Sequence, residues 1–281
     1  MAAELSSRHQ PAPTRILILT TMPVSTPSIC QRLRRNSIVW LLITLAAATG
    51  LGPASAQEQA PSVRWQSSLQ EFAAADKLAM PAGQGVLFVG SSTIRMWSTL
   101  ANDFQSLPVV INRGYGGSTL SDCSHMVRQL VTQYHPAQVL VYGVENDLFE
   151  GQKPTQVRDS LVRFMELVRK ELPDTRIGFI SIKPSPSRQE LLPAIHHANA
   201  MIADYLKTQK NADYIDIYNP MLGEEGQFRP ELFLPDMLHM NAQGYALWRS
   251  VIAPYVVQTR SPPLSHKNAA GAPLSTGVVN R

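Results

Sequence analysis

The chain has 281 residues, 44% of them hydrophobic and 16% charged, which fits a soluble globular core of one domain with some chain to spare. Its net charge of +4 arises in the first 56 residues, which hold five of the 25 Lys and Arg side chains and one of the 21 Asp and Glu side chains. The rest of the chain carries 20 of each sign, which argues against a basic nucleic-acid surface, and we expect no nucleic-acid partner.

Residues 1–56 have the pattern of a secretory signal peptide. Basic residues at 32–35 precede an apolar run at 37–52, and small residues at 54–56 supply a cleavage site. An uncleaved membrane anchor is the alternative, although the run is shorter than the roughly 20 residues that a membrane span needs. A start at Met22 is also open, because the stretch before the basic residues is long. We therefore predict cleavage after about Ala56, a periplasmic or secreted protein, and no stable membrane span in the mature form.

After a polar, alanine-rich lead-in at 57–80, which has a helical pattern at 68–78, short apolar runs alternate with helix-length segments. The apolar runs are rich in β-branched residues, as buried parallel strands tend to be, and lie at 85–90, 108–114, 138–143, 176–182 and 213–218. Apolar residues recur at helical spacings at 120–134, 155–172, 191–209 and 241–257. This alternation predicts an α/β domain at 81–260, a three-layer α/β/α sandwich around a parallel sheet of about five strands. The polar, proline-bearing composition of 261–281 predicts a disordered tail.

Sheets of this kind place their sites at the carboxyl ends of the strands. The first predicted strand ends in Gly90, and Ser91 and Ser92 follow at once. A hydroxyl at this turn can attack an ester, and its own backbone N–H, at the positive end of the next helix, can bind the oxyanion that forms. The alternative is that one of the two serines only caps the helix.

Two later strand ends carry groups that suit the same cleft. The loop at 112–119 contains three glycines, which leave backbone N–H groups open to close approach by a substrate. Asn146 and Asp147 follow the third predicted strand and offer a side-chain amide. Each of these signals alone also fits a flexible turn or a helix cap.

Asp236 and His239 lie three residues apart, just before the last predicted helix. This spacing lets the carboxylate hold the Nδ1–H of the imidazole, which leaves Nε2 free to accept a proton from a hydroxyl. No acid stands three residues before the other histidines of the mature chain in a comparable loop; they are His125, His135, His196, His197 and His266. A metal site at His196 and His197 is not favoured, because the pair lies within a predicted helix.

Together these four segments resemble the SGNH hydrolases, the GDSL-like esterase and lipase superfamily, over about 85–258. Ser92, Gly117, Asn146 and His239 match the serine, glycine, asparagine and histidine of the family's blocks, in the family's order. The resemblance implies the flavodoxin-like fold of these hydrolases. The chain departs from the pattern at Ser91, where the family has aspartate, and at Val144, where it has glycine. These departures bear on substrate range more than on activity, because neither removes a catalytic atom.

The resemblance also implies a reaction, the hydrolysis of carboxylic esters through an acyl-enzyme. Ser92 is then the nucleophile, His239 the base and Asp236 the group that orients the imidazole. The backbone N–H groups of Ser92 and Gly117 and the side-chain amide of Asn146 form the oxyanion hole, and no metal or organic cofactor is needed. We expect a small-molecule or carbohydrate ester with a short acyl group, such as acetyl. Open alternatives are a non-catalytic carbohydrate-binding module, an acyltransferase, a lysophospholipase and a thioesterase, and no oligomeric state is predicted.

Several other residues suggest structural roles. Cys30 leaves with the leader, so Cys123 stays alone and is expected as a small buried side chain on a helix rather than as a nucleophile. Arg95 and Trp97 are expected to serve packing and a salt bridge, and Asp147 to brace its loop. Two basic residues that follow the fourth predicted strand either meet an anionic substrate at the mouth of the cleft or, as we expect, lie in a solvated loop; they are Lys183 and Arg188.

Overall fold

The computed structural model describes residues 61–257. The predicted leader at 1–56 and the predicted tail at 261–281 lie outside the described residues. Within the described part, no helix is both long enough and apolar enough to cross a membrane.

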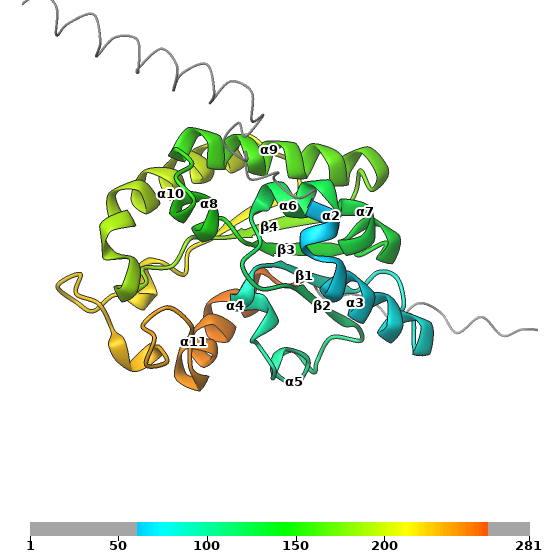
Figure 1. Ribbon diagram of the computed structural model, residues 1–281, viewed down its shortest axis with the longest axis horizontal. Helices are drawn as coiled ribbons and strands as arrows, with labels where there is room; N and C mark the ends of the chain where they lie inside the picture. The colour runs from blue at the N-terminus through cyan, green and yellow to red at the C-terminus, as the bar shows by residue number, and fades with distance from the viewer. Residues whose placement is uncertain (1–60, 258–281) are drawn as a thin grey trace, which may run out of the picture. The chain divides into compact units, whose positions relative to one another are not determined.

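Five parallel strands form one sheet in the order β2-β1-β3-β4-β5 (Figure 1). The strands are β1 (Val86–Gly90), β2 (Val110–Gly114), β3 (Gln138–Tyr142), β4 (Arg176–Ile180) and β5 (Ala212–Ile215). Gly90 is in register with both Gly114 and Tyr142, so the three neighbouring strands end level with one another. The chain passes from β1 to β2 on one side and then to β3 on the other, which makes the carboxyl end of β1 a topological switch point where such sheets place their sites.

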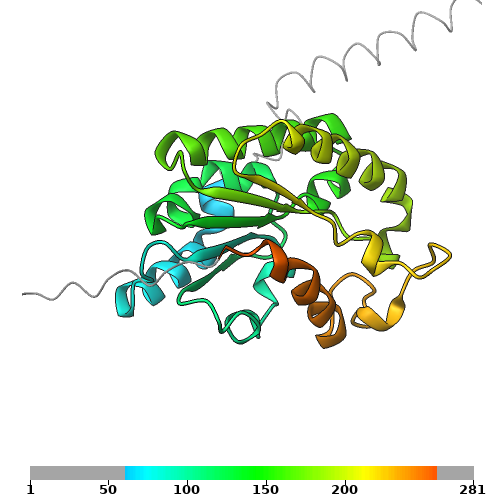
Figure 2. The same ribbon diagram turned by 180° about the vertical axis from the view of Figure 1, so that it is seen from behind.

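Helices cover both faces of the sheet, which confirms the predicted three-layer α/β/α fold (Figures 1 and 2). One face packs against α3 (Gln66–Leu78), α6 (Leu120–His125), α7 (Val127–Leu130), α8 (Glu145–Phe149), α9 (Pro154–Glu171) and α10 (Leu192–Lys207). The other face packs against α4 (Ser92–Arg95), α5 (Leu100–Asp103) and α11 (Ala242–Ile252). Side chains of β1 alternate between the two cores, as a strand buried on both faces requires: Leu87 and Val89 enter one, Val86 and Phe88 the other.

Short elements complete the chain. They are α2 (Pro61–Arg64) and the 3₁₀ turns η1 (Thr132–Tyr134), η2 (Pro186–Leu191), η3 (Asn219–Met221), η4 (Pro230–Leu232) and η5 (Ala253–Tyr255). The helix predicted at 120–134 is broken into α6, α7 and η1, because Met126 and Val131 leave helical geometry, with φ values of −112° and −132°. The four-residue helices α2, α4 and α5 span about one turn each, too little for an apolar period to show in the sequence.

An aromatic cluster on the second face joins α4 to α11. Trp97 is 1% exposed and packs against Phe88, Phe104, Tyr245 and Trp248, which confirms its expected packing role. The Tyr245 hydroxyl donates a hydrogen bond of 2.9 Å to the backbone oxygen of Thr93. The helix that begins at Ser92 and the helix that follows His239 are therefore held directly against each other.

Candidate active site

The turn after β1 places Ser92 at the carboxyl end of the sheet. Gly90 has a φ of 147°, and a Cβ atom there would lie 1.4 Å from the Tyr142 carbonyl oxygen, so only glycine fits. Ser91 donates its backbone N–H to that same oxygen at 3.1 Å. Ser91 is buried at the N-cap of α4 but makes no capping hydrogen bond with its side chain. The capping alternative therefore fails for Ser91, and Ser92 is the first residue of α4.

A folded loop before α11 carries Asp236 and His239. Oδ1 of Asp236 accepts the backbone N–H groups of Leu238 at 3.0 Å and His239 at 2.9 Å. Asn241 ends this loop as the N-cap of α11, because its side-chain oxygen accepts two backbone N–H groups of the first turn. The loop therefore has a fixed shape, and it leaves the second oxygen of Asp236 free for the imidazole.

The structure brings Ser92, His239 and Asp236 into one hydrogen-bonded chain. His239 Nδ1 lies 2.7 Å from Oδ2 of Asp236, and His239 Nε2 lies 3.0 Å from Oγ of Ser92. Burial raises the pKa of Asp236, but hydrogen bonds from the His239 side chain and from two backbone N–H groups outweigh it and hold that pKa at about 2. Asp236 is therefore a carboxylate at neutral pH, so Nδ1 carries the hydrogen and Nε2 accepts from the serine.

Gly117 is exposed in the otherwise largely buried loop between β2 and α6, and its φ of 75° favours glycine. Within the described residues, the backbone N–H groups of Ser92 and Gly117 form no hydrogen bond. The preceding Gly114 fixes the loop against α4, because a Cβ atom there would lie 2.2 Å from the backbone nitrogen of Arg95. On the other side, Trp65 packs edge-on against Tyr115 at 5.3 Å between ring centroids.

Asn146 lies in α8, directly after β3, and its amide is held at both ends. Nδ2 donates to the backbone oxygen of Ser118 at 2.9 Å, and Oδ1 accepts from Nη1 of Arg188 at 3.3 Å. The neighbouring Asp147 accepts the backbone N–H of Leu120 at 3.0 Å, which confirms its expected bracing role. Val144 adopts helical geometry, with a φ of −92°, and its side chain enters the core, so this position needs no glycine.

Lys183 and Arg188 are buried, so the expected solvated loop is wrong. Lys183 is 1% exposed and pairs with the carboxylate of Glu145, which is 4% exposed. Ser185 accepts from Lys183 at 2.7 Å and donates to Glu145 at 2.6 Å, and Tyr142 donates to Glu145 at 2.9 Å. Burial raises the pKa of Glu145, but Lys183 and its hydrogen bonds outweigh this and lower it. A buried carboxylate needs such partners, and its presence explains why the lysine is drawn inward.

The sequence interpretation therefore missed Glu145 and Ser185. The available signals were two basic residues after the fourth predicted strand and an acid directly before Asn146, after the third. Arg95 is also corrected, because it is exposed and forms no ion pair with any residue that the structure describes. Cys123 is fully buried on α6 as expected, and burial raises the pKa of its thiol to about 12, which keeps it protonated.

A parallel α/β sandwich with a serine, a histidine and an aspartate joined by hydrogen bonds at the strand ends is an arrangement of serine hydrolases. The chain belongs to the GDSL-like lipase/acylhydrolase family, whose model matches residues 81–247. This confirms the resemblance noted from the sequence. A search of curated proteins gives no match.

Three solved structures have a similar fold. A protein described as an acylhydrolase from Bacteroides fragilis has a TM-score of 0.59 at 22% identity, covering 71% of this chain and 97% of its own. A GDSL-like lipase from Bacteroides thetaiotaomicron has a TM-score of 0.57 at 23% identity, covering 66% of this chain and 96% of its own. A catalytic mutant of an acetylxylan esterase from Geobacillus stearothermophilus has a TM-score of 0.53 at 12% identity, covering 64% of this chain and 98% of its own. At these identities, the similarity is evidence of the fold alone.

Proposed function

We propose that the protein is an exported serine esterase that hydrolyses carboxylic esters through an acyl-enzyme. The observation that carries this proposal is the chain of hydrogen bonds of 3.0 Å from Ser92 to His239 and 2.7 Å from His239 to Asp236. It joins a hydroxyl to a base whose tautomer is fixed, which is what activation of a serine requires. Membership of the acylhydrolase family supports the same reaction.

In the first half of the reaction, Oγ of Ser92 attacks the ester carbonyl carbon while Nε2 of His239 takes the hydroxyl proton. The C–O bond to the alcohol then breaks, and His239 donates its proton to the departing oxygen. In the second half, His239 takes a proton from water, whose oxygen attacks the acyl carbon. The bond from that carbon to Oγ of Ser92 then breaks, and His239 returns the proton to Oγ as the acid leaves. Asp236 stays a carboxylate throughout and stabilises the imidazolium, in keeping with its low pKa.

The negative charge that develops on the carbonyl oxygen needs donors that do not have to reorganise. The open N–H groups of Ser92 and Gly117 and the second Nδ2 hydrogen of Asn146 serve this purpose in the proposal. Loss of one such donor costs about 3 kcal/mol of barrier in other hydrolases, roughly a hundredfold or more in rate.

For substrate we propose a small ester with a short acyl group, such as an acetyl group on carbohydrate. The acetylxylan esterase with the same fold supports this class. A non-catalytic carbohydrate-binding module is disfavoured, because a binder gains nothing from an aligned serine, histidine and aspartate. Transfer of the acyl group to a sugar hydroxyl uses the same groups and is distinguished by product analysis with an acceptor present.

The test is hydrolysis of p-nitrophenyl acetate by a matched pair of variants. Ser92→Ala removes the attacking oxygen, so we expect turnover to fall by at least about a thousandfold with an unchanged fold. Ser91→Ala is the control, because this neighbouring buried serine makes no capping hydrogen bond, and its turnover should stay near the wild-type value. A fluorophosphonate probe should label wild type and Ser91→Ala but not Ser92→Ala. Undiminished turnover by Ser92→Ala would refute the proposal.

Export is the remaining part of the proposal, and it depends on the leader pattern at 1–56. Expression in a bacterial host followed by cell fractionation tests it. We expect activity in the periplasm or medium and an amino terminus close to Gln57. A full-length chain found in the membrane fraction would instead favour the uncleaved anchor.

A further inference from the structure

Arg188 contacts the side chain of Asn146 from the segment that follows β4. Its Nη1 lies 3.3 Å from Oδ1 of Asn146 and 3.2 Å from the backbone oxygen of Glu145, so one guanidinium nitrogen serves two neighbouring oxygens. The contact joins η2, the turn that follows β4, to α8, which carries the proposed oxyanion donor.

The two partners of Asn146 together fix which way its amide faces. The Ser118 backbone oxygen can only accept a hydrogen bond, and the Arg188 guanidinium can only donate one. If the amide were flipped, its oxygen would face the carbonyl and its NH₂ group would face the guanidinium, so both contacts would become repulsive. In the observed orientation one Nδ2 hydrogen binds Ser118, and the other is left for the substrate.

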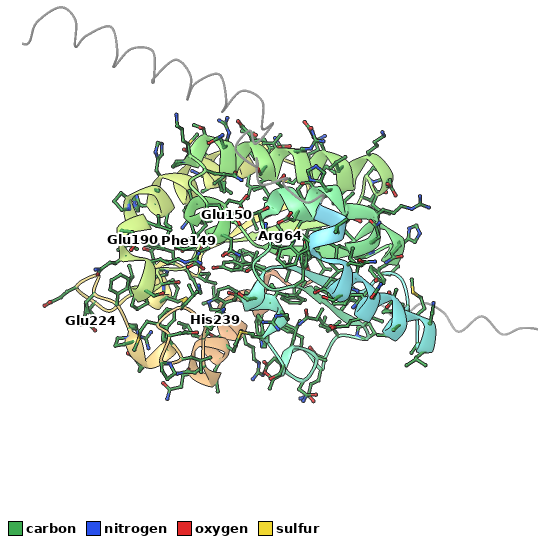
Figure 3. The ribbon with its side chains drawn as sticks, in the orientation of Figure 1. Arg64, Phe149, Glu150, Glu190, Glu224 and His239 are labelled. Carbon is green, nitrogen blue, oxygen red and sulfur yellow. The ribbon has the colours of Figure 1, made fainter. Side chains whose placement is uncertain are left out.

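Arg188 is itself held in place on several sides. It is 8% exposed, and its guanidinium lies 4.1 Å above the ring of Phe149, an exposed residue at the end of α8 (labelled in Figure 3). Its backbone N–H donates to Ser185 at 2.9 Å, and Ser185 belongs to the buried cluster with Lys183 and Glu145. The cation is therefore part of a rigid assembly and is not a mobile surface side chain.

The same segment also contacts the loop that carries Asp236. Ser187 donates its backbone N–H to the backbone oxygen of Met237 at 3.1 Å. One short segment thus connects the side of the site that holds Asn146 with the side that holds the imidazole and its carboxylate.

We propose that Arg188 is a positioning residue that holds the amide of Asn146 with Nδ2 toward the oxyanion. This inference rests on the proposed esterase function. Because the oxyanion develops only in the transition states, Arg188 acts mainly on kcat, and because it acts through Asn146, its effect disappears when Asn146 is removed.

The first experiment is a double-mutant cycle on p-nitrophenyl acetate with Asn146→Ala and Arg188→Met. We expect Arg188→Met to lower kcat about tenfold or more and to change KM by less than about threefold. The double variant should be as slow as Asn146→Ala alone, since the effects of residues that act as a unit do not multiply. Arg64→Met is the matched control, because Arg64 is an exposed arginine that pairs with Glu150 at 3.4 Å, and its kcat should stay near wild type (both residues are labelled in Figure 3). Multiplicative effects in the cycle would overturn the inference.

A second variant and a second measurement cover misfolding and lack of turnover. Arg188→Lys keeps the charge, so it should fold and recover part of the loss in kcat. If Arg188→Met has the wild-type kcat and leaves the NMR signal of the Asn146 amide unchanged, the inference is overturned. Heteronuclear NMR of the Asn146 side-chain amide, assigned with Asn146→Asp, reports whether Arg188 determines the environment of this amide, and it needs no turnover. We expect this signal to shift or broaden in Arg188→Met and to stay unchanged in Arg64→Met. Absence of turnover in the wild type would refute the esterase proposal, while the NMR signal would still decide the role of Arg188.

Discussion

At the scale of single residues, Asp147 is a buried acid beside the proposed oxyanion donor. Its side chain is fully buried, and this burial raises the pKa of its carboxyl group. The hydrogen bond from the backbone N–H of Leu120 lowers the pKa, but burial outweighs it and the pKa is about 7. The folded protein therefore binds a proton at Asp147 more tightly than the unfolded chain does. Between about pH 4 and 7 this group makes the free energy of unfolding fall as pH rises, by at most about 1.4 kcal/mol per pH unit.

Asp147→Asn tests this sign. The variant keeps an oxygen that can accept from Leu120 but cannot ionise, so it should gain stability relative to wild type as pH rises from 4 to 7, and the difference should level off above about pH 7. Urea unfolding of both proteins across this range measures the difference, in which the other carboxylates cancel. A difference that does not vary with pH would contradict the prediction.

At the scale of elements, the end of β1 depends on close contact between two strands. Gly90→Ala would place a methyl group 1.4 Å from the Tyr142 oxygen, so β1 and β3 would have to separate where Ser92 is positioned. We expect a loss of at least about 3 kcal/mol in the free energy of unfolding, or no soluble protein. Gly151→Ala is the control: Gly151 also has a positive φ, of 91°, but a Cβ atom there meets nothing within 4 Å. Its cost should be about 1 kcal/mol of backbone strain, measured by thermal and urea unfolding.

The same scale shows which elements the sequence predicts well. All five strands were predicted within about three residues of their observed ends. The central strands β1 and β3 are apolar runs that are buried throughout, and β2, β4 and β5 each end in a buried residue before a turn. Short helices such as α8 were not, because one turn has no readable period. The segment from Lys183 to Arg188 was misread for another reason. Lys183 is buried against the carboxylate of Glu145, which lies 38 residues earlier in the sequence, and local composition cannot predict such a pairing.

At the scale of the whole molecule, the hydrolase domain includes the lead-in, although the family model matches only from residue 81 onward. Leu69 and Phe72 of α3 pack against the core of one face, and Trp65 lies beside Gly117. Asp76 of α3 pairs with Arg113 of β2 at 2.5 Å, with both side chains largely buried. The sequence predicted only a helix here, because its alanine-rich pattern does not indicate what the helix contacts.

If α3 belongs to the cooperative unit, Asp76→Ala should destabilise the whole domain. The change leaves the Arg113 guanidinium buried without its carboxylate and removes the acceptor of the Tyr134 hydroxyl at 2.5 Å, so we expect a loss of about 3 kcal/mol in the free energy of unfolding. Asp204→Ala is the matched control, because Asp204 pairs with Lys207 on the surface with both side chains 75% exposed, and its loss should stay below about 1 kcal/mol. Urea unfolding followed by two probes, far-UV circular dichroism and tryptophan fluorescence, measures both. An Asp76→Ala variant no less stable than Asp204→Ala would mean that α3 is attached to the hydrolase domain without stabilising it.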